Sequence, residues 1–462
     1  MAQGGMRPTP RKDARRADRA HSERNAGRSY ANGRRRPTPS ESGSRPRQQQ
    51  RQGRSSRPQR RGPQVSPIVT LAAIAVVAVA LLAWGASAVT SALFAGPDEK
   101  AASEQGQAAT PESDGVTFCA VGDNLMNENL LELVDAQDGS SGDGSYDFAS
   151  LYQDIRPTVE GYDIAFVNQE TVLGGTDKFG YAGYPSYNTP DSMADALEDA
   201  GFDVVNTNSN HTYDIWVDAI LHQQQVFAAH PALTTVGSYA SEQDRETPRV
   251  VERDGIRFAF LSYSYGQNGY ELSDLPNDYY AAPYSAEAMD ADVARAKAAA
   301  DVVVVYMHGG TEYANEPDDW ERQVAQHAAD LHVDLVIGSH VHVIQPVEWV
   351  EASDASTRTL VAYGLGDFVS GYHDYPDCIM SGMLSCTFVP QDDGSIAIED
   401  VVWHPLIEHW EDGKDTVMLV SDYTEKLAKR NELLAGLDDP YGWIVDKTRE
   451  VMGDTPGVKM DM

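Results

Sequence analysis

Histidines that follow two apolar runs are the residues of this chain best suited to chemistry. Residues 301–310 contain four consecutive valines and end in His308 and two glycines, and residues 334–342 end in His340 and His342. Apolar runs bounded by turn residues predict strands that are buried on both faces of a parallel sheet. Functional groups of such sheets gather beyond the carboxyl ends of the strands. His340 and His342 are two residues apart, so in an extended chain they would point the same way.

Three converging imidazoles are the donors that a transition metal needs, although a single histidine after a strand is more often a helix cap or a loop residue. Histidines at two equivalent strand ends favour the metal site, provided that other strand ends supply oxygen ligands. Polar residues do follow the other predicted strands, namely Asp123, Asn168, Glu170, Asn210 and His211. Carboxylate, amide and imidazole together suit Mn²⁺, Fe or Zn²⁺ better than Mg²⁺ or Ca²⁺. Two ions would need a bridging carboxylate, and Glu170 lies in the middle of the series.

The elements that carry these residues alternate between strand and helix. Apolar runs predict strands at residues 116–121, 163–167 and 202–206, and helical spacing predicts helices at residues 147–160, 191–200, 215–229 and 318–332. This alternation predicts an α/β domain. Asp254-Gly255 between two apolar runs indicates a hairpin, and residues 263–284 form a tyrosine-rich loop that packs on the surface or holds a substrate. Helical spacing predicts helices at 421–437 and 441–452, hence a helical extension over 411–462.

Charge divides the chain into two unlike parts. Residues 1–64 contain 18 Lys and Arg against 4 Asp and Glu, a net charge of +14, which leaves −48 for the remainder of a chain whose total is −34. The basic part is rich in Arg, Pro, Gly, Ser and Gln, which predicts a disordered tail. The acidic part argues against nucleic-acid binding. It is compatible with recruiting divalent cations, and equally with a well-solvated surface.

The apolar segment at residues 65–94 is expected to anchor the chain in a membrane. No charged residue occurs between Gly62 and Pro97, which is long enough to cross a bilayer core of about 30 Å. Arginines before it and acidic residues after it place the N-terminus in the cytoplasm and the rest outside. The alternative is a cleaved signal peptide, but the long leader favours an uncleaved anchor. A polar linker at residues 95–115 then leads to a folded domain at 116–410.

Three cysteines occur, at Cys119, Cys378 and Cys386, without the spacing of a zinc knuckle. Cys119 lies in an apolar strand pattern and is expected to be a packed thiol. Cys378 and Cys386 are close in sequence, and pairing between them stays open.

Six short sequence words, in order, resemble the CapA family of poly-γ-glutamate capsule biosynthesis proteins. They begin at Gly122-Asp123, Asn168-Gln169-Glu170, Asn208-Ser209-Asn210-His211, His308-Gly309-Gly310, Gly338-Ser339-His340 and Tyr363-Gly364-Leu365-Gly366-Asp367. The resemblance covers roughly residues 116–405. It implies a calcineurin-like metallophosphoesterase fold, a four-layer αββα sandwich.

The resemblance also implies the roles of individual residues. It implies two divalent ions bound by Asp123, Glu170, Asn210, His308, His340 and His342, with Glu170 as the bridge. His211 would be the general acid or would stabilise the transition state. Asp214 would orient His211, or else cap the following helix.

The chain departs from the wider phosphoesterase pattern at Leu125, where those enzymes carry a histidine ligand, so one ion would bind weakly. It departs again where Asn168-Gln169-Glu170 replaces the usual Gly-Asp-x-x-Asp word. Asp367 stands where CapA-like proteins tend to have Asn.

The sequence predicts a membrane-anchored external protein with a two-metal hydrolase site. The resemblance to the CapA family implies that it acts in synthesis, export or attachment of an anionic surface polymer such as poly-γ-glutamate. The alternatives are a non-catalytic accessory subunit of a polymer synthase complex, a metallophosphoesterase acting on a phosphate ester, and a relic site that binds no metal. The expected partners are the membrane, and the polymer or its synthase subunits.

Overall fold

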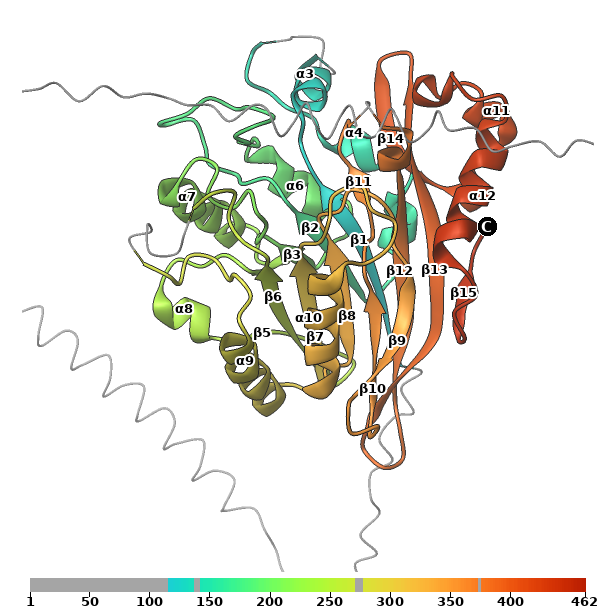
Figure 1. The fold of residues 1–462 in the computed structure, drawn as a ribbon. Coiled ribbons are helices and arrows are strands. Elements are labelled where there is room, and N and C mark those ends of the chain that lie inside the picture. The colour runs from blue at the N-terminus through green and yellow to red at the C-terminus, as the bar shows by residue number, and fades with distance from the viewer. Residues whose placement is uncertain (1–114, 137–141, 271–276, 373–374) are drawn as a thin grey trace, which may run out of the picture. The chain divides into compact units, whose positions relative to one another are not determined.

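The computed structural model describes residues 115–136, 142–270, 277–372 and 375–462 (Figure 1). The predicted tail, the predicted membrane anchor and nearly all of the linker lie outside these residues. Within the described residues, no helix has the length and the apolar character needed to cross a bilayer. The described residues belong to one compact unit.

A nine-stranded sheet carries most of the early strands. Its members are β1 (Val116–Asn124), β2 (Ile164–Gln169), β3 (Val204–Asn206), β4 (Thr234–Val236), β11 (Asp367–Val369), β12 (Met380–Pro390), β13 (Ile396–Glu411), β14 (Lys414–Leu419) and β15 (Val458–Met460). The order is β14-β13-β12-β1-β2-β3-β4, with β11 beside β1 and β15 beside β13. The strands β1 to β4 are parallel, and β12 is antiparallel to β1.

A six-stranded sheet carries the histidine-bearing strands. Its members are β5 (Arg249–Arg253), β6 (Ile256–Ser264), β7 (Val302–His308), β8 (Leu335–Ser339), β9 (Val347–Glu351) and β10 (Arg358–Ala362). The order is β5-β6-β7-β8-β10-β9, and β6, β7, β8 and β10 are parallel. The hairpin predicted at Asp254-Gly255 is confirmed, because both residues have positive φ between β5 and β6, as a tight hairpin turn requires.

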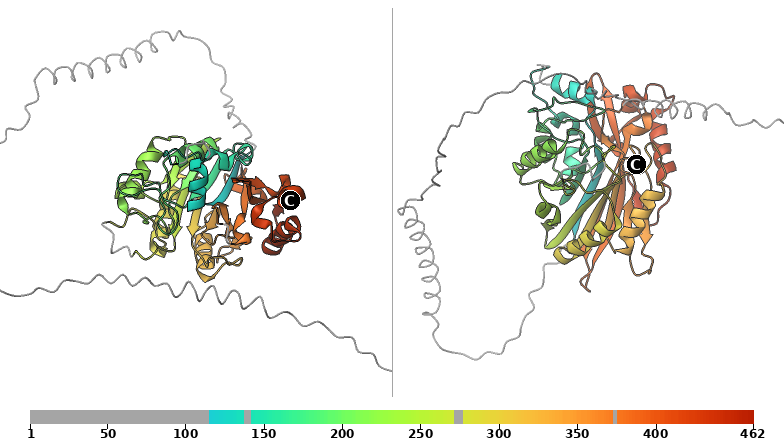
Figure 2. Two further views of the ribbon diagram at one scale, coloured as in Figure 1. Left: turned by 90° about the horizontal axis from the view of Figure 1, so that it is seen from above. Right: turned by 60° about the vertical axis from the view of Figure 1, so that its left-hand side comes forward.

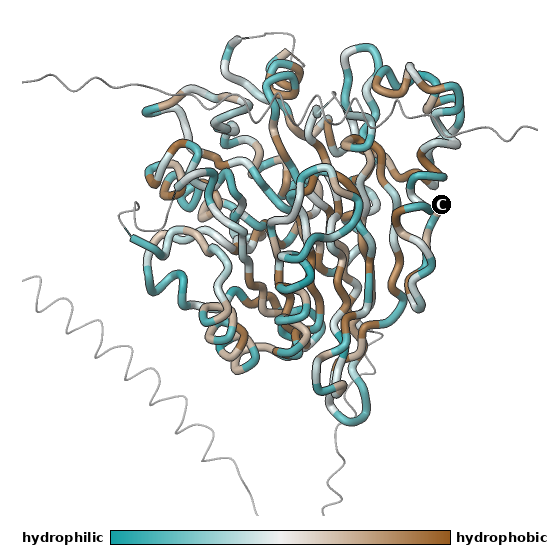
Figure 3. The backbone as a smooth tube through the Cα atoms, viewed as in Figure 1, coloured by the Kyte–Doolittle hydropathy of each residue, from teal (hydrophilic) through white to brown (hydrophobic). Residues whose placement is uncertain are grey.

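Side chains alternate between the two faces of each strand, and this alternation builds separate cores. Phe118 and Ala120 of β1 enter a core shared with Phe258 and Val304 of the other sheet, so the two sheets pack face to face. Cys119 enters a second core with the helices outside the nine-stranded sheet. Figure 3 shows the apolar strands running through the interior and polar residues in the loops.

Helices cover the outer faces of both sheets, as the two views of Figure 2 show. The nine-stranded sheet packs against α3 (Glu128–Ala136), α4 (Ala149–Tyr152), α5 (Arg156–Val159), α6 (Ser192–Asp199) and α7 (Val217–Ala228), and the six-stranded sheet packs against α9 (Ala286–Ala299) and α10 (Asp319–Asp330). A short helix, α8 (Glu242–Glu246), precedes β5. The described residues therefore form a mixed α/β fold, as predicted, with layers in the order helix, sheet, sheet, helix.

The predicted C-terminal helical extension is wrong in part. Residues 411–462 do contain α11 (Glu425–Ala428) and α12 (Pro440–Met452), but β14 and β15 pair with β13 and so belong to the nine-stranded sheet. Helical spacing of leucines over 421–437 was misleading, because most of that stretch forms short turns that pack on the inter-sheet core. The predicted helix at 147–160 is likewise two short helices.

All three cysteines are buried free thiols. Cys119 is packed as predicted, on the outer face of β1. Cys378 and Cys386 do not pair: Cys386 lies in the core between the sheets and Cys378 in a separate small apolar cluster.

Candidate metal centre

Polar residues predicted at the strand ends meet at one edge of the sandwich. Asp123 is the second-last residue of β1, Glu170 directly follows β2, and the loop after β3 carries Asn210 and His211. In the facing sheet, His308 ends β7, and His340 and His342 follow β8. Seven of the eight predicted site residues are buried, and the Asp214 side chain is nearly so. Because parallel strands in both sheets end here, residues far apart in sequence are brought together.

One group of ligand atoms, the first triad, consists of Glu170, His308 and His340. Their ligand atoms all lie within 4.8 Å of one another. The Asn210 Oδ1 atom lies 2.8 Å from His308 Nε2, so this amide oxygen joins the group. All four residues were predicted as ligands, and the structure brings them together.

A second group, the second triad, consists of Asp123, His342 and Asp367, also within 4.8 Å of one another. Asp367 Oδ1 lies 2.8 Å from His342 Nδ1, and Asp123 Oδ2 lies 4.0 Å from the same nitrogen. Asp123 and Asp367 are direct neighbours in the parallel pairing of β1 with β11.

Asp367 is a candidate ligand that sequence reasoning missed. It was noted only as a departure from related sequences, yet it stands beside Asp123 in the position where another ligand is needed. Leu125, which replaces the usual histidine, is buried instead and its backbone N–H bonds to Val369. The available signal was that Asp367 directly follows a glycine, as Asp123 does.

Close contact between β1 and β11 explains how the two carboxylates meet. A Cβ atom on Gly122 would lie only 1.9 Å from the carbonyl oxygen of Gly366, so only glycine fits there. The same contact allows the Asp123 backbone N–H to donate to Gly366 over 3.0 Å.

The predicted geometry of His340 and His342 is wrong. The chain is not extended there, since both residues have positive φ, at 100° and 62°. The two imidazoles therefore diverge into different triads, with ring centroids 5.9 Å apart. A non-glycine residue rarely adopts such a backbone, and strain of this kind is typical of functional sites.

Supporting hydrogen bonds fix several ligands in place. Asn168 Nδ2 donates to Asp123 Oδ1 over 2.6 Å, and Asn206 in turn donates to Asn168. The His340 backbone N–H donates to Asp123 Oδ2 over 3.0 Å. In the first triad, the Tyr306 hydroxyl lies 2.9 Å from His308 Nδ1, which leaves Nε2 to face Glu170 and Asn210. Such partners orient metal ligands in proteins.

Burial shifts the protonation of the first triad. Burial raises the pKa of Glu170 well above its usual value, and the neighbouring Asp123 and Asp367 raise it further. Burial lowers the pKa of His308 well below its usual value, and lowers the pKa of His340 to about 3 with help from the other histidines. The two imidazoles are thus neutral, the state that binds a metal.

Electrostatics differ in the second triad. Burial alone would lower the pKa of His342, but the adjacent Asp367 reverses this and the pKa rises to about 10. Burial and then Asp367 raise the pKa of Asp123, and burial raises that of Asp367. The charges that act on Glu170 are those of Asp123, His342 and Asp367, all in the second triad. Its own Oε1 atom lies 3.6 Å from His308 Nε2 in the first, so the carboxylate is near both triads.

Unsatisfied polar atoms test whether these residues fit metal ions. Both carboxylate oxygens of Glu170, Nδ1 of His340 and Oδ2 of Asp367 are buried without a hydrogen-bond partner. Buried polar groups in proteins are nearly always paired, so four such atoms at one place call for a ligand. The donor set of carboxylates, amide and imidazoles matches divalent metals, and the residues fit them.

His211 and Asp214 form a hydrogen-bonded pair beside the triads. Asp214 Oδ2 lies 2.7 Å from His211 Nδ1, and it also accepts the Tyr187 backbone N–H over 2.9 Å. The alternative role of Asp214 as a helix cap is wrong, because α7 begins at Val217 and Trp216 precedes it without any side-chain cap. The predicted orienting contact is present.

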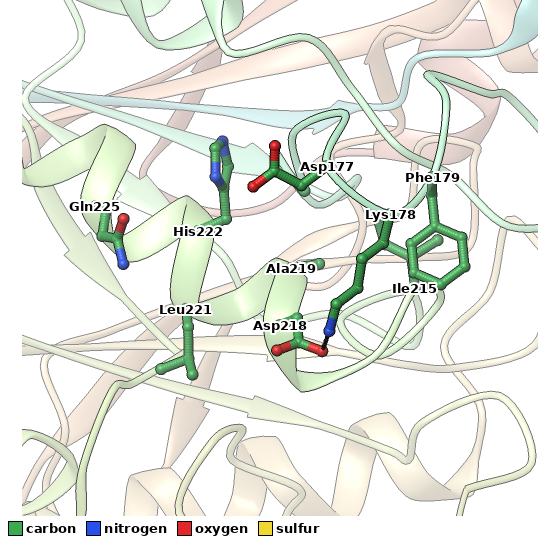
Figure 4. Close-up of a pocket in the computed structure, with 10 residues that line it drawn as sticks. Asp177, Lys178, Phe179, Ile215, Asp218, Ala219, Leu221, His222 and Gln225 are labelled. Carbon is green, nitrogen blue, oxygen red and sulfur yellow. Dashed lines mark hydrogen bonds and ion pairs between the residues drawn. The ribbon is translucent and has the colours of Figure 1, made fainter.

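A surface pocket elsewhere can be set apart from this centre. It lies between the loop at 174–179 and α7 (Figure 4), and no residue of either triad lines it. Lys178 pairs there with Asp218, and His222 pairs with Asp191. Its lysine and its histidine are therefore already paired with carboxylates.

A family model, "Bacterial capsule synthesis protein PGA_cap", matches residues 117–372, which is more than half of the chain. This chain belongs to that family. The matched range contains every residue of the two triads together with His211 and Asp214.

Two curated relatives have similar sequences. The PGA biosynthesis protein CapA of Bacillus subtilis (strain 168) is 26% identical over 269 residues, 57% of this chain and 67% of that protein. The capsule biosynthesis protein CapA of Bacillus anthracis is 24% identical over 269 residues, 56% of this chain and 60% of that protein. The matched region spans about two thirds of these capsule biosynthesis relatives or less.

Solved structures show a weaker likeness. The NAD nucleotidase of Haemophilus influenzae is 10% identical with a TM-score of 0.40, over 73% of this chain and 67% of that chain. The sulfate thiohydrolase SoxB of Thermus thermophilus is 11% identical with a TM-score of 0.36, over 74% and 60%. At these TM-scores the likeness supports no conclusion about function.

Proposed function

We propose that this chain acts in synthesis, export or attachment of an anionic surface polymer such as poly-γ-glutamate, and that its metal centre is a two-metal hydrolytic or transfer site. Membership of the capsule synthesis family supports the general role. The observation that carries the catalytic part is the pair of adjacent buried triads with four unpaired ligand atoms.

Glu170, His308, His340 and Asn210 would hold one ion, and Asp123, His342 and Asp367 the other, with Glu170 shared. The mixed donor set favours Mn²⁺, Fe or Zn²⁺. Two such ions would supply Lewis-acid chemistry, by polarising a carbonyl or phosphoryl oxygen of the substrate.

His211 is the proton donor of this proposal. With Asp214 accepting from Nδ1, the other ring nitrogen carries the transferable proton toward the leaving group. Asp214 is itself fixed by the Tyr187 backbone, so the imidazole orientation is set before the substrate arrives.

The cellular setting of the proposal rests on the sequence. The apolar segment at 65–94 would anchor the chain, with its N-terminus in the cytoplasm and the metal centre outside the cell. There the centre would meet the polymer or the synthase subunits that make it.

Turnover by the purified full chain tests the catalytic part. The chain is loaded with Mn²⁺ and incubated with γ-glutamyl peptides and with aryl phosphates. The proposal expects turnover of the γ-glutamyl amide, and a loss of about 100-fold or more in the His211→Gln variant, whose metal content stays normal. His222→Gln is the matched control, since His222 also pairs with an aspartate but lies outside the centre.

Three outcomes would redirect the proposal. Turnover of aryl phosphates alone would make the chain a phosphoesterase. Full metal loading without turnover of either substrate would favour the accessory role. A chain that binds no metal would overturn the centre itself.

A further inference from the structure

Exposed aromatic side chains gather around the metal centre. Among the described residues, six large aromatic side chains are exposed, namely Phe179 (47%), Tyr184 (76%), Trp216 (37%), Tyr265 (46%), Tyr270 (38%) and Tyr313 (37%). Tyr265 and Tyr313 contact rings of the triads directly, and the other three reach the centre through a neighbour: Tyr184 through Tyr187, and Tyr270 through Trp216, which lies two residues after Asp214. These five, all except Phe179, are named the aromatic rim. Aromatic surface left in water is typical of a binding site.

The rim reaches both triads. The Tyr265 ring lies 4.8 Å from the ring of His340, which belongs to the first triad. The Tyr313 ring lies 5.8 Å from the ring of His342, which belongs to the second. Since His340 and His342 are adjacent rings, an occupant that touches both tyrosines must pass over both triads.

The rim also continues past the candidate proton donor. Tyr187 lies edge-on to His211 with centroids 4.7 Å apart, and the exposed Tyr184 lies 6.3 Å from Tyr187. Trp216 follows Asp214 closely and packs against Tyr270 at 5.5 Å. Aromatic surface therefore lies on the His211 side as well as over the triads, which suits an extended chain better than a small molecule.

Two lysines lie close to rim residues, and both are already paired with carboxylates: Lys447 with Asp377, and Lys178 with Asp218. In the described part of the chain, no lysine or arginine forms a hydrogen bond or an ion pair with a residue of either triad, His211 or Asp214. The nearest charges acting on Tyr265 and Tyr313 include Glu312, a carboxylate. A polyanion would therefore meet unpaired cations only at the metal ions themselves, so the rim outside them suits an uncharged occupant.

We infer that the aromatic rim binds an uncharged saccharide chain that runs across the metal centre. A pyranose ring presents an apolar C–H face, which packs on an aromatic ring, and hydroxyls at its edge, which hydrogen-bond to tyrosine O–H and amide groups. Asn268, which contacts both the Tyr265 hydroxyl and His211, offers such an amide in the middle of the rim. The inference goes beyond the proposed function, because it concerns binding and holds whether or not the site turns over a γ-glutamyl amide.

Calorimetric titration of the metal-loaded full chain tests this inference, in a detergent without a sugar headgroup. The probes are cellohexaose, chitohexaose, poly-γ-glutamate and adenosine. We expect at least one hexasaccharide to bind, and Tyr184→Ala and Tyr265→Ala each to weaken that binding about tenfold. Phe179→Ala is the matched control, an equally exposed aromatic outside the rim, and it should change nothing. Tyr184 touches no ligand residue, so its variant keeps the metal content unchanged.

The outcomes separate this inference from the proposed function. If the unaltered chain does not turn over the γ-glutamyl amide but still binds a hexasaccharide, the catalytic proposal fails and the inference about the rim stands. Binding of the hexasaccharide should also persist in His211→Gln. Binding of poly-γ-glutamate or adenosine with neither hexasaccharide bound overturns the inference, and so does hexasaccharide binding that the rim variants leave unchanged. Turnover without any saccharide binding overturns the inference alone.

Discussion

The two triads sit side by side at the same strand ends, yet they are electrostatically unlike. The first triad has one carboxylate and two imidazoles whose pKa values fall below the usual range. The second has two carboxylates and one imidazole whose pKa rises to about 10. In the absence of metal, the protonated imidazole of His342 supplies the positive charge beside Asp123 and Asp367. The imidazoles of the first site are thus already neutral, and the raised pKa of Glu170 is the only barrier of this kind there, whereas in the second site the imidazole itself must first give up a proton.

This difference follows from what surrounds each imidazole rather than from the imidazole itself. His308 contacts an amide oxygen and a tyrosine hydroxyl, and the Glu170 carboxylate is farther away at 3.6 Å, so desolvation decides its charge. His342 contacts the carboxylate of Asp367 at 2.8 Å, so charge attraction outweighs desolvation. His340 and His342, only two residues apart in sequence, also have opposite charge states, because burial lowers the pKa of His340 to about 3.

Removing Glu170 should have the largest effect, because its carboxylate lies between the triads. Glu170→Gln is expected to weaken binding of both ions by more than about 100-fold, beyond the loss typical of a supporting group. Metal content after dialysis measures this. Glu321→Gln is the matched control: Glu321 is also buried, with its pKa raised by burial to about 7, but it caps α10 outside the centre. Loss of only one ion in Glu170→Gln would contradict the bridge.

The next largest effect should come from a change at Asp367, which is expected to affect metal binding at the second triad alone. Asp367→Ala is expected to remove one ion of two, and to leave the ion at Glu170, His308 and His340 in place. Asp367→Asn keeps an oxygen donor but loses the charge, so a smaller loss of affinity is expected. Asp415→Asn serves as the control, since Asp415 is a buried carboxyl that belongs to neither triad. Two ions retained in Asp367→Ala would show that Asp367 is not a ligand.

Much of this centre was accessible from the sequence, because one rule governs it: side chains that follow parallel strands converge at one sheet edge. That rule placed Asp123, Glu170, Asn210 and His308 correctly. It could not place Asp367, because β11 follows a strand of one sheet and then joins the other, beside β1. Nothing in the local pattern of residues 363–369 encodes that crossing.

The backbone conformation after β8 also could not be predicted from the sequence. Alternation assumes an extended chain, and the positive φ of His340 and His342 breaks the assumption. Likewise, the short strands β14 and β15 have little alternation of their own and are defined by pairing with β13. Tertiary contacts rather than local propensity decide such elements.

Lowering the pH should weaken metal binding at the second triad more than at the first. Below the pKa of about 10, an ion must displace the proton of His342, so its affinity falls by up to tenfold for each unit that the pH is lowered. The imidazoles of the first triad hold no proton to displace near neutral pH, so they add no such dependence. Metal content near about pH 6 should approach one ion, and two near about pH 8.5. Equal loss of both ions on acidification would remove the distinction between the triads.

The smallest predicted effect concerns the support of a single ligand. Tyr306→Phe removes the hydroxyl that lies 2.9 Å from His308 Nδ1 and leaves the packed ring in place. Without this partner the imidazole is less firmly oriented toward Glu170, so the first ion is expected to bind about tenfold more weakly. The second ion should be unaffected, because neither Asp123 nor Asp367 hydrogen-bonds to Tyr306. Tyr263→Phe is the control, since its buried hydroxyl bonds to Asp292 on the other side of the six-stranded sheet. A competition titration with a metal chelator resolves the two affinities, and equal weakening of both ions would mean that the triads act as one unit.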